Sequence, residues 1–449
     1  DGMVAYNEAK RDCEALVNYI DAIINTAMNG GDPMTVQEPS APAPAAAPPA
    51  AAATNTIRNK TRLCNADRVL FAKGGYRPQT MHRTSNGERG KTMAELSPMM
   101  QQYLEIKKQH RDEILFYRIG DFYEMFFEDA LTASKELDLT LTGKQCGLEE
   151  RAPMCGVPFH SYEGYVARLI AKGYKVAICE QVEDPAKAKG LVKRDIIRVV
   201  TPGTVIESSM LQDDRNNYIA SIYLKGKKAG LCFADVSTGT AHITELAADK
   251  IAPAVITELC RFHPSEVLMN PGLLDCREVT AYIKKNMTCS VELVEDERYA
   301  PGLVAASLES QFGRDWPQTT GMAENGLVRF AMAALLEYLH DTQIKGVERL
   351  KTVVTYNEAQ FMRLSPVTRA NLELTETLRG REKRGTLLWV LDKTSTAMGK
   401  RMLRSWIEQP LLSSKLINQR LNAVESLVRQ TVVRGDLTDE LHYIADMER

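Results

Sequence analysis

Hydrophobic residues recur along the chain with two different periods, and the changes of period predict where strands and helices alternate. An apolar run of strand length covers residues 114–119, and helical spacing follows over residues 122–137. Helical spacing resumes after Ser161, and two more strand-like runs cover residues 175–179 and 196–200. Short strands alternating with helices predict a compact α/β domain.

A second α/β unit is predicted further along the chain. Residues 218–224, 230–236 and 240–246 have the apolar pattern of strands, and helical periods return over residues 255–262 and 328–339. The last hundred residues are helix-rich in pattern. Their final apolar stripe is of the kind that packs on other helices, which we expect outside this chain. The stripe consists of Leu416, Ile417, Leu421, Val424, Leu427 and Val428.

The first 92 residues differ from the rest in composition. After one predicted helix over residues 4–28, every residue from Ala41 to Ala53 is Ala or Pro. Residues 55–92 then contain nine Lys or Arg against two acidic residues. Such segments bury too little apolar surface to fold, so we predict a disordered Ala/Pro-rich linker and a basic tail.

Composition and charge narrow the class of protein. The 449 residues are 44% hydrophobic and 25% charged, which is typical of a globular domain, and 56 basic against 58 acidic side chains give a net charge of −2. No run approaches the ~18 to 20 consecutive apolar residues of a membrane span. Nine scattered cysteines form no CxxC pair. We therefore expect a cytoplasmic protein with no membrane contact, no zinc site and no disulfide framework.

Motifs for nucleotide chemistry and for hydrolysis are weak. The nearest match to a phosphate-binding loop, residues 85–92, has Ser85 where the first glycine is required and follows no predicted strand. Asp235 ends a predicted strand, where a nuclease could hold a metal, but no other carboxylate is predicted at an equivalent strand end. We expect Asp235 to cap a turn and His160 to make structural hydrogen bonds, with no catalytic residue, cofactor or metal in this chain.

Two segments have features of nucleic-acid contact. Residues 184–198 are rich in basic side chains, which suits phosphate contact, although solvated surface is a common origin of such runs. Aromatic side chains crowd the predicted strand-to-helix junction at residues 116–129. Packing in a core and contact with bases are both open interpretations of these aromatics.

The junction sequence, Gly120-Asp-Phe-Tyr-Glu-Met-Phe126, resembles the signature that begins the mismatch-recognition domain of the DNA mismatch repair family MutS. Other segments resemble that family in order and spacing, and the resemblance covers residues 93–449. These segments are residues 98–104, 153–160, 176–181, 184–185 and 200–204, followed by residues 369–374 and 396–403, which resemble the opening of its helical core.

The resemblance implies a protein that encircles duplex DNA as a homodimer and recognises mismatches or small loops. By position in the motif, Phe122 is the wedge that enters the base stack and kinks the duplex, and Glu124 contacts the displaced base. Deformability is what such a wedge detects, because a mispaired step resists unstacking less than a paired one. The candidates for contact with the DNA backbone are Lys144, Lys187, Lys189, Lys193 and Arg194.

The resemblance also implies how the chain is divided. It assigns residues 93–207 to an α/β mismatch-recognition domain, residues 208–345 to an α/β ribonuclease-H-like connector, and residues 346–449 to a truncated all-α core and lever domain. Residues 1–92 match nothing in that family, and we interpret them as a fusion or as translation reading through from an upstream gene.

Chemistry and partners are expected from the resemblance as well. The family's clamp and its ATPase domain with Walker motifs are absent from this sequence, so ATP and Mg²⁺ are expected only with that C-terminal domain. The chain itself is then not an enzyme. A MutL-type repair partner and a nucleoid-associated location in the cytoplasm are expected from the family.

Two other classes of function stay open. A non-catalytic protein-interaction fragment would show no salt-sensitive binding to DNA. A ribonuclease-H-like nuclease would cleave DNA with a metal, and Asp235→Ala would abolish the cleavage.

Overall fold

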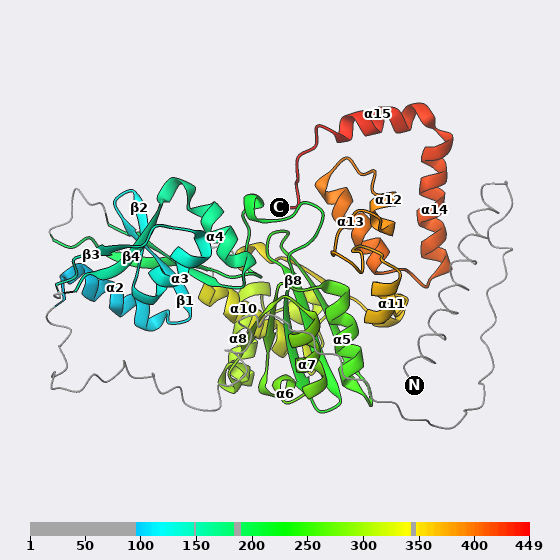
Figure 1. Cartoon of the computed structure of the whole chain (residues 1–449). Coiled ribbons are helices and arrows are strands. Elements are labelled where there is room, and N and C mark those ends of the chain that lie inside the picture. Colours follow the sequence, from blue (N-terminus) through cyan, green and yellow to red (C-terminus); the bar gives the residue numbers. More distant parts are fainter. Residues whose placement is uncertain (1–95, 148–149, 184–189, 343–346) are drawn as a thin grey trace, which may run out of the picture.

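The computed structural model describes residues 96–147, 150–183, 190–342 and 347–449, so the features predicted for residues 1–92 lie outside the described residues. Three regions of the chain are distinct in Figure 1: an α/β region in cyan, a second α/β region in green and yellow, and a helical region in orange and red. Each α/β region contains one six-stranded sheet. None of the helices described has the length and apolar character that a membrane crossing requires.

The first sheet, which we call the recognition sheet, has the strand order β3-β4-β2-β1-β5-β6. Helices α3 and α4 pack on one face and α2 on the other, so both faces are covered. Strands β1 and β5 are parallel, and the other neighbours are antiparallel. The elements are α2 (Pro98–Gln109), β1 (Glu113–Ile119), β2 (Phe122–Phe126), α3 (Phe127–Leu137), β3 (Thr142–Lys144), β4 (Ala152–Pro158), α4 (Tyr162–Ala171), β5 (Lys175–Gln181) and β6 (Arg194–Val200).

The helical spacing predicted over residues 122–137 is wrong in its first five residues. Those residues form strand β2, which pairs with β1 on one side and with β4 on the other, and α3 begins only at Phe127. The physical reason is that β4, which follows α3 and β3 in the chain, supplies a second set of backbone hydrogen bonds to this segment. Periodicity within the segment carries no information about that partner.

The second sheet, which we call the connector sheet, has the order β11-β10-β7-β8-β9-β12. Strands β7, β8 and β9 form an antiparallel meander, and β10, β11 and β12 pair in parallel with their neighbours. The strands are β7 (Ile219–Lys225), β8 (Lys228–Asp235), β9 (Thr240–Ala247), β10 (Glu266–Met269), β11 (Ser290–Leu293) and β12 (Thr352–Thr355).

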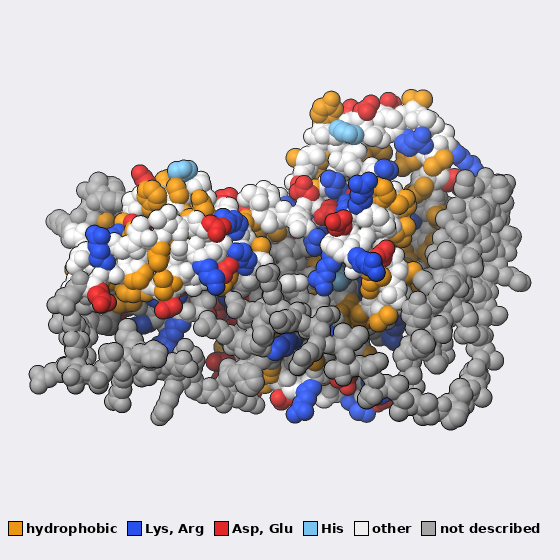
Figure 2. Space-filling view, viewed as in Figure 1, with side chains coloured by type: hydrophobic (Ala, Val, Ile, Leu, Met, Phe, Trp, Pro, Cys, Tyr) orange, Lys and Arg blue, Asp and Glu red, His pale blue; other side chains and the backbone are white. Residues whose placement is uncertain are grey.

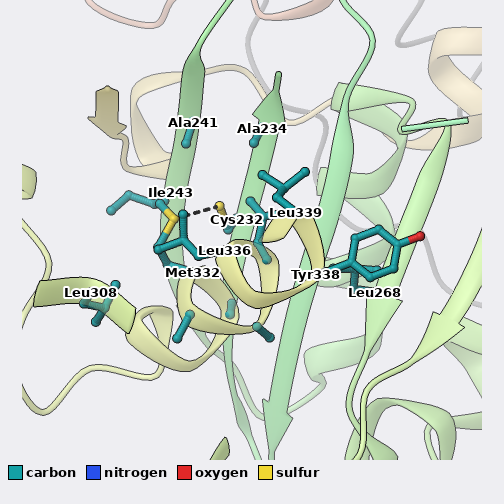
Figure 3. Close-up of a cluster of buried hydrophobic side chains, with 14 of the residues drawn as sticks. Cys232, Ala234, Ala241, Ile243, Leu268, Leu308, Met332, Leu336, Tyr338 and Leu339 are labelled. Carbon is teal, nitrogen blue, oxygen red and sulfur yellow. Dashed lines mark hydrogen bonds between the residues drawn. The ribbon is translucent and has the colours of Figure 1, made fainter. Parts of the chain in front are cut away.

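Helices cover both faces of the connector sheet. On one face α10 packs against β8 and β9, where the Cys232 sulfur lies 3.9 Å from that of Met332 (Figure 3). A Cβ on Gly230 of β8 would lie 2.4 Å from the Leu327 carbonyl oxygen, so only glycine permits this close approach. The helices of this region are α5 (Ile251–Phe262), α6 (Pro271–Leu274), α7 (Arg277–Asn286), α8 (Pro301–Phe312), α9 (Trp316–Thr320) and α10 (Val328–Thr342).

A buried carboxylate joins the two α/β regions. Glu266 of β10 is fully buried and accepts hydrogen bonds from the Thr201 hydroxyl at 2.5 Å, the Gly203 amide at 3.0 Å and the Tyr338 hydroxyl at 2.7 Å. Thr201 and Gly203 directly follow the last strand of the recognition sheet. Because buried polar groups are costly unless paired, this network holds the recognition sheet against the connector.

The helical region lies beside the connector sheet, and the chain curves through α14 and α15 so that the C-terminus returns to the segment between the two sheets (Figure 1). The apolar stripe predicted on α14 is present, and its side chains are exposed among the described residues. Figure 2 shows apolar side chains on the side of the helical region where α14 lies. Its helices are α11 (Pro366–Asn371), α12 (Leu387–Leu391), α13 (Ala397–Glu408), α14 (Ser414–Arg429) and α15 (Thr431–Leu441).

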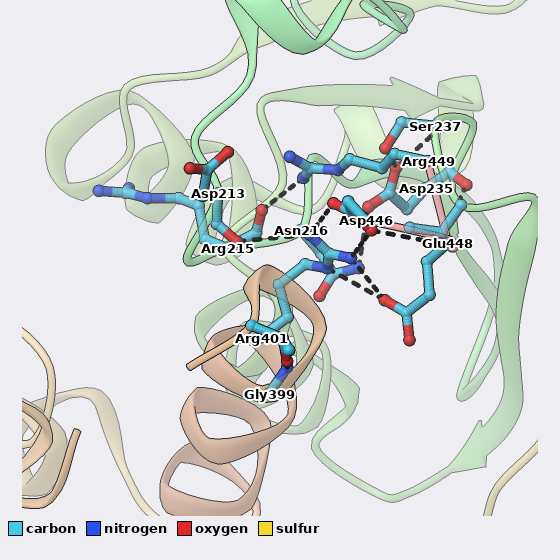
Figure 4. Close-up of polar contacts among 12 residues, drawn as sticks. Asp213, Arg215, Asn216, Asp235, Ser237, Gly399, Arg401, Asp446, Glu448 and Arg449 are labelled. Atoms are coloured by element: carbon cyan, nitrogen blue, oxygen red, sulfur yellow. Dashed lines mark hydrogen bonds and ion pairs between the residues drawn. The ribbon is translucent and has the colours of Figure 1, made fainter. Parts of the chain in front are cut away.

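Arginines of α13 tie the helical region to the rest of the chain. Arg401 is buried and donates to the Asp213 carbonyl at 3.4 Å. Within the helical region its guanidinium also binds the Asp446 carboxylate at 2.7 and 2.8 Å and Glu448 at 2.7 Å (Figure 4). Arg404 donates to the Asp214 carbonyl at 3.1 Å. Asp214 lies in the segment that joins the two sheets. The hydrogen bonds of the α13 arginines therefore attach the helical region to that segment.

Candidate nucleic-acid interface

The β1–β2 turn presents an aromatic side chain to solvent. Ile119 pairs with Phe122 across a two-residue turn, and Gly120 adopts a left-handed φ of 55° that glycine tolerates at little cost. Phe122, the first residue of β2, is 48% exposed, whereas Tyr123 directly after it is 2% exposed. The strand therefore buries its middle in the domain core and leaves its first ring outside.

Glu124 lies on the same face of β2 as Phe122, because side chains alternate along a strand. Its carboxylate forms an ion pair with the Lys144 ammonium of β3 at 2.5 Å. Gly156 on the intervening strand β4 pairs with Glu124 and has no side chain to separate the two. The structure thus brings together two predicted site residues that are 20 positions apart, an arrangement the sequence did not suggest.

A second exposed aromatic, Phe159, was missed by the sequence analysis. It begins a 3₁₀ turn (Phe159–Ser161) after β4 and is 38% exposed. Its amide donates to the Asp121 carbonyl at 3.0 Å, and the Arg118 guanidinium lies 3.7 Å from its ring centroid. The register Phe122↔Pro158 puts Phe159 at the same end of the sheet as Phe122, and only this strand pairing reveals it.

Two buried polar groups of this domain have pKa values that their surroundings shift. The Tyr123 hydroxyl donates to the Glu180 carboxylate, and burial together with that hydrogen bond raises the pKa of Tyr123 well above its usual value. Burial also raises the pKa of Asp129, although the Lys107 ammonium, 2.9 Å from this carboxylate, opposes the shift. Tyr123 is therefore a neutral hydrogen-bond donor at physiological pH. Its hydrogen bond to Glu180 anchors the strand directly after the turn.

The predicted phosphate contacts have different surroundings. Lys187 and Lys189 lie outside the described residues, and Lys193 is exposed, as a phosphate contact requires. Arg194 donates to the Arg118 carbonyl at 2.8 Å, and its guanidinium lies 5.0 Å from the Tyr117 ring centroid. Arg194 is thus engaged inside the domain, which weakens its case as a phosphate contact.

The carboxylate of Asp235, the candidate metal ligand of a nuclease, is engaged by hydrogen bonds within the fold. It is 1% exposed and accepts hydrogen bonds from the Asn216 side chain at 2.9 Å, the Asn217 amide at 3.1 Å, and the Ser237 amide and hydroxyl at 2.9 and 2.5 Å. Figure 4 shows Asn216 and Ser237 beside it. Among the described residues, no group of three His, Cys, Asp or Glu side chains is placed to hold a metal ion. This is the geometry of a turn cap.

Comparison with known proteins identifies the family of all three regions. Residues 97–209 match MutS domain I, residues 217–351 match MutS domain II, and residues 367–449 match MutS domain III. The chain belongs to the MutS family. The resemblance noted in the motifs is thereby confirmed, and the exposed Phe122 turn lies within the match to MutS domain I.

Curated relatives carry the same family name. The chain is 46% identical over 357 residues to the DNA mismatch repair protein MutS of Lachnoclostridium phytofermentans, which is 80% of this chain and 38% of the relative. It is 47% identical over 357 residues to that of Ruminiclostridium cellulolyticum, covering 80% of this chain and 40% of the relative. The chain thus spans about two fifths of the length of these MutS proteins.

Proposed function

We propose that this chain recognises mismatched DNA and that Phe122 is the residue that enters the base stack. The observation that carries the proposal is the 48% exposure of this ring at a strand end within the match to MutS domain I. Inserting an apolar side chain from the minor groove costs a few kcal/mol of unstacking, and a mispaired step resists less than a paired one. Phe122 therefore detects deformability, and mismatches or small loops are its targets.

Glu124 completes the proposed site once its ion pair opens. A carboxylate near phosphates is repelled, and the Lys144 ammonium at 2.5 Å balances its charge in the free protein. DNA phosphates compete for Lys144, and its departure frees Glu124 to contact the edge of the displaced base. Lys144 thus pairs with the Glu124 carboxylate in the free protein and with a DNA phosphate in the complex.

The wider assembly is proposed from the family. The family resemblance implies a clamp and a C-terminal ATPase domain, where ATP and Mg²⁺ would bind, and the present residues would contribute recognition rather than catalysis. Homodimerisation around the duplex and a MutL-type partner belong to that full-length context. Residues 346–449 form the start of its core and lever.

The connector has the strand order of a ribonuclease-H-like fold, which supports that element of the proposal. Three antiparallel strands in sequence are followed by two parallel ones, in the spatial order β11-β10-β7-β8-β9. The carboxylate of Asp235 accepts four hydrogen bonds within this sheet, so we assign the connector a structural rather than a nuclease role.

The proposal is tested by replacing Phe122 with Ala and measuring affinity for matched and mismatched duplexes. Base stacking on an aromatic ring is worth about 1–3 kcal/mol, so discrimination should fall about 5- to 150-fold. Affinity for matched DNA, which depends on phosphate contacts, should stay nearly unchanged. Trp389→Ala is the matched control, since this α12 aromatic is also 48% exposed but lies in the helical region.

Two results would contradict the proposal. Full discrimination by Phe122→Ala would show that the ring does not detect mismatches. A loss of about 3–5 kcal/mol in the free energy of unfolding would identify it as a packed core aromatic instead.

A protein-interaction fragment is the second candidate function, and the exposed apolar groove of the helical region favours it. The groove is lined by Trp406 of α13, by Leu411 after it and by one side of α14, where the Arg420 guanidinium lies 3.9 Å from the Trp406 ring centroid. Under this alternative the chain would show no salt-sensitive DNA binding, which the same duplex titrations measure.

A further inference from the structure

Arg118 is bound on several sides just before the exposed turn. Its Nε donates to the Gly120 carbonyl at 2.5 Å, and one terminal nitrogen lies 3.5 Å from the Glu180 carboxylate. The flat face of the guanidinium covers the Phe159 ring at 3.7 Å. Only 15% of the Arg118 side chain is exposed. The residue therefore connects strand β1, the turn and the 3₁₀ turn after β4.

Asp121, the second residue of the turn, is bound to Phe159, the residue on which Arg118 stacks. The Phe159 amide donates to the Asp121 carbonyl at 3.0 Å, and Phe122 pairs with Pro158 directly before it. Both residues of the turn thus have their carbonyls held, one by Arg118 and one by the residue on which Arg118 stacks. No Cβ contact restrains Gly120 itself, since nothing lies within 4 Å of the position a Cβ would occupy.

We propose that Arg118 is a positioning residue that, through Phe159, keeps the turn rigid and the Phe122 ring raised for insertion. The inference rests on the proposed function of Phe122 as the wedge. A side chain that must separate stacked bases works only if its backbone does not yield, because any flexibility lost on binding is subtracted from the affinity. Arg118 removes that flexibility in advance.

This role differs from a phosphate contact. The Nε and one terminal nitrogen of Arg118 are directed at protein acceptors, and its face is covered by Phe159. A phosphate contact would contribute equally to matched and mismatched duplexes and would add to the salt dependence of binding. A positioning residue acts only through the wedge.

The test is a double-mutant cycle of Arg118→Met with Phe122→Ala in the full chain. Arg118→Met alone should reduce discrimination about 2- to 30-fold, the range that a cation–π contact spans, with matched-duplex affinity and the salt slope unchanged. In the Phe122→Ala background the same change should have no further effect on discrimination, because the group through which it acts is gone. Arg118→Lys, which keeps the charge near Glu180 but not the flat face, should recover some of the loss.

Each alternative result overturns the inference. Equal weakening of both duplexes with a flatter salt slope makes Arg118 a phosphate contact. A further loss of discrimination in the Phe122→Ala background shows an effect independent of the wedge. If Arg118→Met does not fold, Phe159→Leu removes the stacking partner and must give the same selective loss.

The failure of this inference is distinguishable from failure of the proposed function. If Phe122→Ala keeps full discrimination, the wedge itself is refuted. If Phe122→Ala loses discrimination while Arg118→Met and Phe159→Leu keep it, only the role of Arg118 falls.

Discussion

The β1–β2 turn of the recognition sheet and the β8–β9 turn of the connector sheet each contain a left-handed glycine, and the two turns differ in how closely the chain packs around them. The β1–β2 turn contains Gly120 at a φ of 55°, and the β8–β9 turn contains Gly239 at a φ of 69°. A Cβ on Gly239 would lie 2.3 Å from the Arg349 carbonyl oxygen, whereas nothing lies within 4 Å of one on Gly120. The Gly239 turn is therefore covered by the backbone near Arg349, and the Gly120 turn is open to solvent.

Their side chains follow the same division. Next to the packed turn, the Asp235 carboxylate is buried and accepts four hydrogen bonds. Next to the open turn, the Phe122 ring is exposed, although burying an aromatic ring would stabilise the fold. The Asp235 carboxylate therefore serves the fold, and the Phe122 ring is accessible to a ligand.

The largest effect on stability is expected at the packed turn. Asp235→Ala leaves several buried donors without a partner, which costs about 1–3 kcal/mol for such a group, so the free energy of unfolding of the connector should fall by about 3 kcal/mol. Hydrogen exchange of the β7–β9 amides measures this in a chain of several domains. Asp121→Ala at the exposed turn is the control and should change it by less than about 0.5 kcal/mol. Equal effects at both turns would remove the distinction between them.

A pH dependence should also distinguish the connector. Burial lowers the pKa of His242 to about 4, against 6.5 in the unfolded chain, even though Asp235 opposes the shift. Between these values the unfolded state binds more protons, so the stability that His242 contributes is fully present above pH 6.5 and is lost as the pH falls toward 4. On acidification to about pH 4.5, the loss attributable to His242 should be about 2 kcal/mol.

The measurement for His242 is the difference in denaturant stability between the wild type and His242→Phe across this pH range. The variant keeps an aromatic ring among Tyr218 and Phe262, whose rings lie 6.0 and 5.6 Å away. The difference between the two proteins should change with pH by that amount. A constant difference would show that His242 titrates normally in the folded state.

The smallest effect is expected beside the open turn. The Glu124–Lys144 pair is partly exposed, with side-chain exposures of 16% and 29%, so Lys144→Met should cost less than about 1 kcal/mol of unfolding free energy. Thermal melting of the recognition sheet in low and high salt checks this. A loss above about 2 kcal/mol would make the pair a structural one and would weaken its proposed role in releasing Glu124.

Local sequence patterns predicted the elements of the fold whose partners are near in the chain. The meander β7–β9 was expected from three alternating runs with short turns, and α5 and α10 from their helical period. Strand β4, the strands β10 and β11 and the parallel partner β12 were missed. Strands β10, β11 and β12 have only four residues each, whereas β4 has seven, and what makes all four segments strands is pairing with other segments of the chain.

The sequence by itself determined the family and singled out Phe122 and Glu124 as candidate site residues, because both depend on side-chain identity in short segments. Only the tertiary structure decided how that motif is presented. It placed Phe122 on a strand rather than a helix, paired Glu124 with Lys144 from β3, and brought Phe159 beside Arg118. Strand register fixed all three arrangements, and register depends on hydrogen bonds between distant segments that no local period encodes.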